Sequence, residues 1–324
     1  FTFWGFLPFP GARLVLWVLF INLVCASLVR LVYRWAQTGI IVTHLGLLLF
    51  FVAAFVTFHG VEESNITLLE GEGANVSTAY HDWELSLWQE SGLKKKVIAF
   101  DSNSLKKGQT LNFDQYGLSI LVKSYYRNCN AYGSDGQDSK SEVLNSSGIV
   151  TLKSAALDKE PAQNFPGGLF RLVGADQGEV DILLFGGEQN PLKITKNKVS
   201  YFIQLRRRRL PLPFALKLND FVMERHPNTD MARSYESFVE VMSPGASREA
   251  HISMNEPLRH RNYTFYQASY SIDQLGRERS TLAVVKNSGR LLPYIATFMT
   301  CAGLTIHLLM MAFQSKKKHT RKAK

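Results

Sequence analysis

The chain has 324 residues, a formal net charge of +10 and a mean hydropathy of −0.06. All 27 acidic residues lie between Glu62 and Glu278, and 27 of the 37 Lys and Arg lie in that stretch extended to Lys286. The middle is therefore neutral, and the basic excess belongs to two ends made of apolar runs edged with basic residues. This patterning indicates a membrane protein and argues against a nucleic-acid partner.

Three apolar runs of 19 to 23 residues cover residues 14–33, 40–58 and 291–313. About 20 helical residues, at ~1.5 Å each, cross the hydrocarbon layer of a membrane. Each run therefore predicts a transmembrane helix; the alternative is a buried helix of a soluble protein. The aromatic-rich residues 1–10 predict an interfacial segment ahead of the first helix.

Basic flanks predict the orientation. Arg30 and Arg34 lie between the first two runs, and six more basic residues follow the third, all of them on the cytoplasmic side by the positive-inside bias. Residues 60–289 are then outside the cytoplasm, and so is the N-terminus. Because the chain begins without Met or a signal peptide, we expect a preceding fourth helix to be missing.

Residues 60–289 predict one large or two small β units. Short segments rich in β-branched and aromatic residues alternate with Gly, Asn, Asp and Pro clusters. The clearest predicted strands are residues 118–126, 180–185, 199–205, 237–242, 263–270 and 280–285. The expected organisation is thus residues 1–59 with two helices, an extracytoplasmic β-rich domain at 60–289, and residues 290–324 with a helix and a basic tail.

Two further patterns bear on chemistry. Cys129 is the one cysteine between residues 60 and 289, so that domain can hold no internal disulfide, and no CxxC or CxxCH motif is present. Residues 206–209 are four consecutive arginines, which predict a solvated loop or strand edge, or contact with lipid headgroups or an acidic partner. No catalytic residue is predicted.

Ionisable side chains inside a membrane are costly and often functional. His44 and His307 each lie well inside a predicted helix, about 7 and 9 Å from its cytoplasmic end, whereas His59 ends the second run and is expected at the interface. A neutral imidazole at such a depth can hydrogen-bond between helices or bind a metal or haem iron. Both uses remain open for His44 and His307.

Several segments resemble ResB-like proteins of system II cytochrome c biogenesis. They are residues 22–30 (NLVCASLVR), 43–55 (THLGLLLFFVAAF), 68–72 (LLEGE), 216–221 (LKLNDF), 237–241 (SFVEV) and above all 252–270 (ISMNEPLRHRNYTFYQASY). The last motif, followed closely by an apolar run and a basic tail, is the most specific. Asn262 stands where the family pattern leads us to expect Gly, and Asn tolerates the left-handed turn that a hairpin there needs.

The resemblance implies a subunit of a complex that carries haem across the membrane and presents it to the CxxCH motifs of apocytochrome c. Its expected partner is a CcsA/ResC-like membrane protein with a tryptophan-rich segment, which would hold the catalytic centre. The family's membrane histidine before Leu-Gly falls on His44, an expected axial ligand of a transient b-type haem shared with that partner; His307 matches no family ligand. The expected location is the bacterial cytoplasmic membrane, or the thylakoid membrane of a plastid.

Alternatives of other classes stay open. The chain could be a scaffold that binds no haem and stabilises a catalytic partner. It could also be an electron-transfer cytochrome b subunit with His44 and His307 as an in-chain pair. Within residues 252–270, Tyr263, Phe265, Tyr266 and Tyr270 predict a core strand or, alternatively, an aromatic docking platform.

Overall fold

The computed structural model describes residues 2–3, 7–8, 11–91, 94–133, 143–227, 229, 232–273 and 275–322. The chain divides into two compact units. The helical unit comprises Phe1–Glu62, Arg259–Thr264 and Val285–Lys324, and the strand unit comprises Glu63–Leu258 and Phe265–Val284. Each unit is described by itself below.

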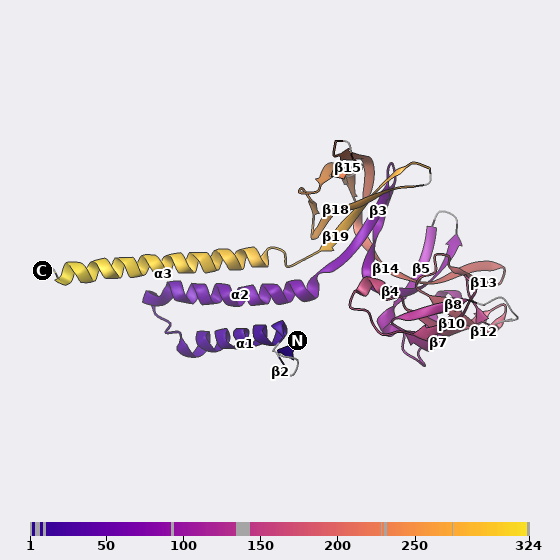
Figure 1. The fold of residues 1–324 in the computed structure, drawn as a ribbon, viewed down its shortest axis with the longest axis horizontal. Helices are drawn as coiled ribbons and strands as arrows, with labels where there is room; N and C mark the ends of the chain where they lie inside the picture. The colour runs from indigo at the N-terminus through magenta and orange to yellow at the C-terminus, as the bar shows by residue number, and fades with distance from the viewer. Residues whose placement is uncertain are drawn as a thin grey trace. The chain divides into compact units, whose positions relative to one another are not determined.

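Within its described residues, the helical unit contains three α-helices (Figure 1). They are α1 (Ala12–Cys25), continued by a π-helical turn at Ala26–Arg30; α2 (Thr38–Gly60), preceded by a 3-10 turn at Trp35–Gln37; and α3 (Leu292–Lys322). Two short strands, β1 (Thr2–Phe3) and β2 (Leu7–Pro8), pair ahead of α1. α2 and α3 confirm the second and third predicted helices, with α3 continuing into the basic tail.

Two helical stretches in the described part of the chain, Trp35–Gly60 and Leu292–Gln314, are long and apolar enough to cross a membrane. Most of their apolar surface is uncovered within the chain, as Phe298 at 75% exposure illustrates, which supports association with a membrane. The first predicted span is shorter than expected. Its apolar helical part, Leu14–Arg30, ends where Leu31 turns to extended backbone after a π-type bond from its N–H to the Ala26 carbonyl. A bundle of three full-length spans is therefore not what these residues form.

α2 and α3 pack antiparallel along a seam of small residues. A Cβ built on Gly39 would lie 2.4 Å from the backbone nitrogen of His307, and one on Gly46 would lie 2.7 Å from that of Thr300. A Cβ on Gly303 would lie 2.4 Å from the nitrogen of Thr43. Only glycine allows backbones this close, and such contacts stabilise helix pairs in a bilayer by van der Waals packing.

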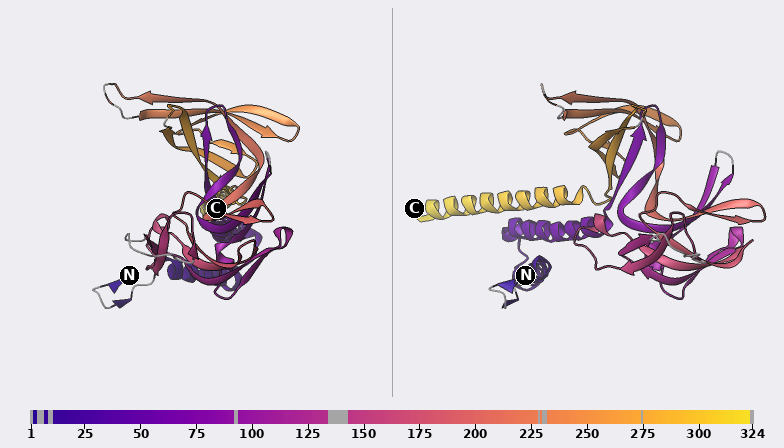
Figure 2. Two further views of the ribbon diagram at one scale, coloured as in Figure 1. Left: turned by 90° about the vertical axis from the view of Figure 1, so that its right-hand side faces the viewer. Right: turned by 45° about the vertical axis from the view of Figure 1, so that its right-hand side comes forward.

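The strand unit confirms the predicted β-rich domain, and all six segments predicted as strands lie within strands. Its ten-stranded sheet has the order β16-β15-β14-β4-β3-β19-β18-β17, with β13 beside β14 and β5 beside β4. These strands are β3 (Glu62–Leu69), β4 (Gly73–Ser91), β5 (Lys94–Asp101), β13 (Leu192–Lys196), β14 (Val199–Arg225), β15 (Ala232–Ser243), β16 (Ala246–Ser253), β17 (Leu258–His260), β18 (Tyr263–Ile272) and β19 (Glu278–Lys286). The long strands β4 and β14 run beside each other (Figure 2).

A five-stranded sheet has the order β6-β7-β11-β12-β9, and β8 pairs with β10 in a small third sheet. The strands are β6 (Thr110–Phe113), β7 (Leu118–Tyr126), β8 (Cys129–Gly133), β9 (Val143–Leu144), β10 (Ile149–Ser154), β11 (Gly167–Ala175) and β12 (Gly178–Phe185). Leu118, Ile120 and Val122 alternate with more exposed residues along β7, as the period of two requires. They pack with Leu85, Leu205 and their neighbours from β4 and β14 into one core.

A second buried region joins β14 and β15 to β18 and β19. Phe265 on β18 is fully buried and meets Phe214 on β14 edge to face. The Ser237 hydroxyl on β15 donates to Gln267 on β18 at 2.7 Å and lies 2.8 Å from the Ser280 hydroxyl on β19. Because these strands are not neighbours in the sheet, the contacts show that the sheet curves until its two halves face each other.

Candidate functional site

His44 lies in the first half of α2, half-buried within the chain. Its Nδ1 is 2.9 Å from the carbonyl oxygen of Ile40, one turn earlier. A carbonyl can only accept, so Nδ1 carries the proton and donates it. In the neutral imidazole the lone pair is then on Nε2, which no hydrogen bond occupies among the described residues.

α2 has two distinct stripes. Gly39, Thr43, Gly46 and Ala53 follow helical spacing along the seam with α3. The second stripe, which we call the aromatic stripe, is His44, Leu48, Phe51, Phe55 and His59, at positions i, i+4, i+7, i+11 and i+15. His44 follows Gly39 by five residues. At about 100° per residue, the two stripes are therefore about 140° apart around the helix axis.

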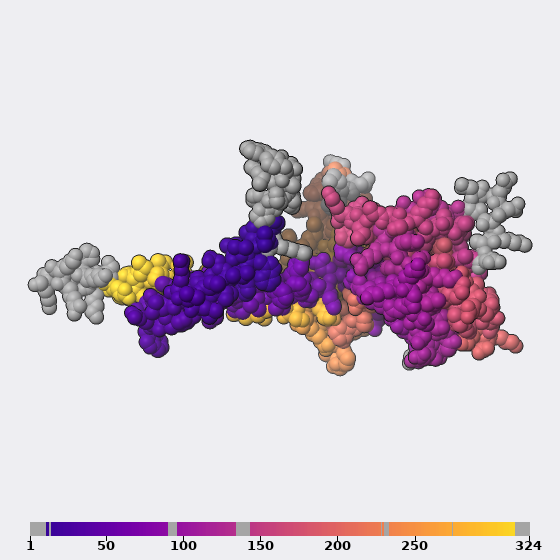
Figure 3. Space-filling view, turned by 90° about the horizontal axis from the view of Figure 1, so that it is seen from below, coloured from indigo at the N-terminus to yellow at the C-terminus, as the bar shows by residue number. Residues whose placement is uncertain are grey.

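The aromatic stripe lies on the side of α2 that α1 approaches. Phe20 of α1 meets Phe51 with ring centroids 5.5 Å apart. Seen from this side, α1 lies in front of α2 and covers part of it (Figure 3). The stripe therefore lies away from α3, with a phenylalanine contact to α1 near its middle.

His307 occupies a different place. It lies in the seam, with its backbone against Gly39. His44 is five residues farther along α2 than Gly39, a rise of about 7 Å, and belongs to the other stripe. The structure therefore sets the two histidines at different levels along α2, with His307 in the seam and His44 on the other stripe.

His59, expected only as an interfacial residue, repeats the geometry of His44 at the other end of the stripe. Its Nδ1 is 3.0 Å from the carbonyl oxygen of Phe55, and its ring lies 4.3 Å from the Phe55 ring and 5.1 Å from the Phe58 ring, centroid to centroid. The recurrence of His44 at i+15 with phenylalanines between is visible in the sequence, but only helical spacing reveals it.

The four arginines lie within β14, not in a loop. Arg206 donates from Nε and Nη2 to one oxygen of Glu84, both at 2.9 Å, and lies over the Trp88 ring. Burial lowers the pKa of Arg206 from its usual value, although Glu84 opposes that shift. The loop prediction was wrong because β14 stays paired with β4 at Arg206, Arg207 and Arg209, across a register shift, and Glu84 of β4 supplies a counter-charge.

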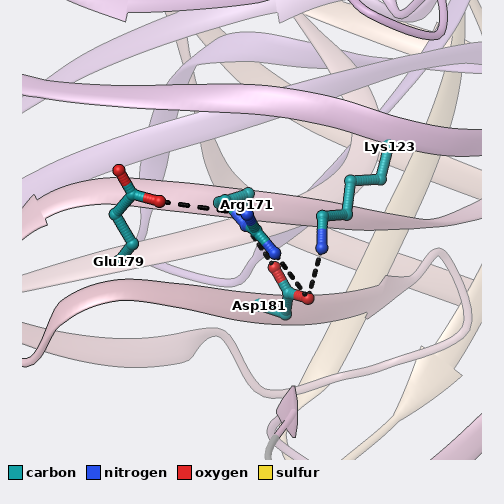
Figure 4. A network of polar contacts seen from close by, with 4 residues as sticks. All are labelled: Lys123, Arg171, Glu179 and Asp181. Atoms are coloured by element: carbon teal, nitrogen blue, oxygen red, sulfur yellow. Dashed lines mark hydrogen bonds and ion pairs between the residues drawn. The ribbon is translucent and has the colours of Figure 1, made fainter.

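A second ion network lies on the five-stranded sheet (Figure 4). Asp181 on β12 accepts from Arg171 Nε at 2.8 Å and from the Lys123 ammonium on β7, and Glu179 lies 3.9 Å from Arg171. The Arg171 hydrogen bond, with help from Lys123, holds the pKa of Asp181 below its usual range. The network links three neighbouring strands, so we interpret it as stabilising the sheet.

Residues 252–270 contain both buried and exposed aromatic side chains. Phe265 is in the core, and Tyr270 contacts Phe221 and Tyr235 at centroid distances of 5.8 and 5.2 Å. Tyr266 is 42% exposed. The core interpretation is thus confirmed for Phe265, while Tyr266 is accessible. Among the described residues, no group of three or more His, Cys, Asp or Glu is placed to hold a metal ion.

Comparison with known proteins gives two matches. The ResB-like family model matches residues 194–292. Protein NrfI of Wolinella succinogenes is 31% identical over 102 residues, which are 31% of this chain and 11% of that protein. The chain thus aligns with a small part of that relative, and the family match begins well after His44. Over residues 194–292, from β13 to the first residue of α3, the chain is similar to ResB-like proteins.

Proposed function

We propose that the chain is a membrane subunit for cytochrome c biogenesis that holds haem on its way to apocytochrome c. The ResB-like region supports the biogenesis role, and the long apolar helices support a membrane location. The proposed arrangement places the basic flanks of the helices in the cytoplasm and the strand unit outside. A CcsA/ResC-like membrane partner would share the haem, carry the attachment chemistry and complete the helical bundle.

The observation that carries this proposal is the hydrogen bond from His44 Nδ1 to the Ile40 carbonyl. Haem iron takes a neutral imidazole as axial ligand, and a second hydrogen bond at the other ring nitrogen fixes the tautomer and orients the ring. His44 Nδ1 makes such a hydrogen bond, which leaves Nε2 for the iron. The apolar residues of its stripe would contact the porphyrin, whose burial is favourable by the hydrophobic effect.

The second axial ligand should come from outside α3. A bis-imidazole site needs the porphyrin between its two histidines, but Gly39 brings α2 into backbone contact with His307. No plane of porphyrin thickness fits there, and the seam faces away from the aromatic stripe. This disfavours the in-chain pair of a cytochrome b subunit and favours a ligand from a partner chain.

The test is haem content of the full chain, purified in mild detergent with its native membrane partners. We expect a b-type spectrum after reduction, and His44→Ala should reduce haem per chain at least about 2-fold. His226→Ala is the matched control, because this exposed histidine lies at the end of β14 in the strand unit. Unchanged haem in His44→Ala would refute the ligand assignment. A complex that co-purifies without haem in the unaltered protein would support the scaffold alternative.

A further inference from the structure

His59 shares with His44 the features that make a haem ligand. Each histidine donates from Nδ1 to the carbonyl four residues earlier, at 3.0 Å for His59 and 2.9 Å for His44. Each therefore presents an Nε2 lone pair, and both belong to the aromatic stripe, turned away from the seam with α3. A rise of about 22 Å separates them along the helix axis, so they cannot bind one iron together.

The surroundings of His59 favour a flat aromatic ligand over water. Phe55 lies against the imidazole at 4.3 Å with an interplanar angle of 38°, and Phe58 meets it edge to face at 5.1 Å. Phe58 is 70% exposed and Phe55 is 57% exposed. Large exposed rings beside an oriented imidazole offer a porphyrin both coordination and stacking.

We infer that His59 is a second haem-iron ligand, at the opposite end of α2 from His44. This inference rests on the proposed function, since it assumes that haem is the ligand of the stripe. His44 and His59 therefore belong to two separate haem sites, which we call the first and the second station. Passage from one to the other breaks the coordinate bond from His44 Nε2 to iron and forms the bond from His59 Nε2, with no change in iron oxidation state or in proton count.

Phe51 and Phe55 lie between the stations on the same stripe. The Phe55 ring is 57% exposed and provides an apolar surface beside His59, whereas the Phe51 ring is half-buried and packs against Phe20 of α1. The Phe20–Phe51 contact with α1 lies between the two histidines. α1 therefore lies where it would contact haem passing from one station to the other.

The test compares four forms of the full chain, purified with its native membrane partners: unaltered, His44→Ala, His59→Ala and the double variant. Haem per chain and the reduced absorption spectrum are measured, with His226→Ala as control. We expect each single variant to lose about half of the haem and the double variant to lose nearly all of it. In a fifth form, His59→Met should keep haem and raise the midpoint potential of one haem population, because thioether ligation favours the reduced state.

The outcomes separate the two proposals. Loss in His44→Ala with no change in haem or potential in either His59 variant overturns the second station and leaves the proposed function standing. Loss in His59→Ala alone supports His59 and refutes His44 as ligand. No change in any variant overturns both. Far-UV circular dichroism and gel filtration show whether a variant that lost haem still folds, and the potential of His59→Met is read from protein that retains it.

Discussion

Gly39 of α2 and His307 of α3 meet backbone to backbone, so closely that a Cβ on Gly39 would lie 2.4 Å from the His307 nitrogen. Gly46 and Thr300 repeat this contact two turns along. The close approach rigidly pairs the two helices and leaves the opposite stripe of α2 for other contacts. Because the seam occupies one side of α2, His44 and His59 on the aromatic stripe lie away from α3.

The seam predicts the effect of enlarging Gly46. Gly46→Val would force its side chain into the Thr300 backbone, which cannot yield as a flexible side chain can. We expect a loss of about 2 kcal/mol or more in stability. Thermal unfolding in detergent measures it, with Leu45→Val as control because Leu45 is 56% exposed on the same helix. Equal melting temperatures for the two variants would contradict the close packing.

The Arg206–Glu84 pair predicts an asymmetry between single and double substitutions. The side chains of Arg206 and Glu84 are 11% and 7% exposed. Glu84→Gln leaves a buried guanidinium without its counter-charge, at an expected cost of about 3 kcal/mol. Arg206→Met combined with Glu84→Leu removes both charges and should cost less than Glu84→Gln alone. Urea unfolding of the full chain, followed by tryptophan fluorescence, tests this order; a double variant that is the least stable of the three would contradict it.

Asp181 predicts a pH dependence. Its pKa in the folded protein lies below that of the unfolded chain, chiefly through Arg171, so its contribution is complete above the unfolded value near ~4 and is lost as pH falls through the folded value. Asp181→Asn should lower the melting temperature by a few degrees at pH 7. The difference from the unaltered protein should narrow below pH 4. A difference that stays constant down to pH 2 would show that the carboxylate charge does not matter.

Phe265 and its neighbour Tyr266 separate the core role of β18 from a docking role. Phe265→Ala removes a fully buried ring and should cost about 4 kcal/mol. Tyr266→Ala should change stability by less than about 0.5 kcal/mol, because that ring is 42% exposed. Urea unfolding of both variants gives the comparison. A large loss for Tyr266→Ala would place its ring in the core as well.

The Cys129 thiol of the folded protein should react only slowly with alkylating agents. Burial raises the pKa of its thiol to about 11, so little reactive thiolate exists at pH 8. In a chain carrying Cys25→Ser and Cys301→Ser, we expect iodoacetamide to label Cys129 only after denaturation. Mass spectrometry measures the labelled fraction; complete labelling of the native protein within minutes would show that the thiol is accessible.

The sequence predicted the helices and strands better than it predicted the contacts between them. Alternation identified strands such as residues 118–126, because one face of that strand meets a core. The apolar runs identified α2 and α3, but composition could not show that the first helix leaves α-helical geometry at Ala26. The four arginines misled because charge suggests exposure, whereas Glu84 lies 122 residues away in the chain and only the fold brings it beside Arg206.

The candidate site shows the same limit. Depth in an apolar run drew attention to both His44 and His307, and the family resemblance favoured His44. Only the packing of Gly39 against His307 distinguishes a seam residue from one on the free stripe. His59 was passed over because its position at a helix end has an ordinary explanation; its hydrogen bond to Phe55 is a three-dimensional observation.

The length of β14 has a consequence for how the strand unit tolerates change. This strand supplies Leu205 to one buried core and Phe214 to the other, and it pairs with β4 on both sides of the register shifts at Arg207/Arg209 and Pro211/Leu216. A slip of one residue in either paired part would turn the apolar side chains of that part outward. Each core therefore fixes the alignment of its own part of β14, and the register shifts between them let one strand serve both cores.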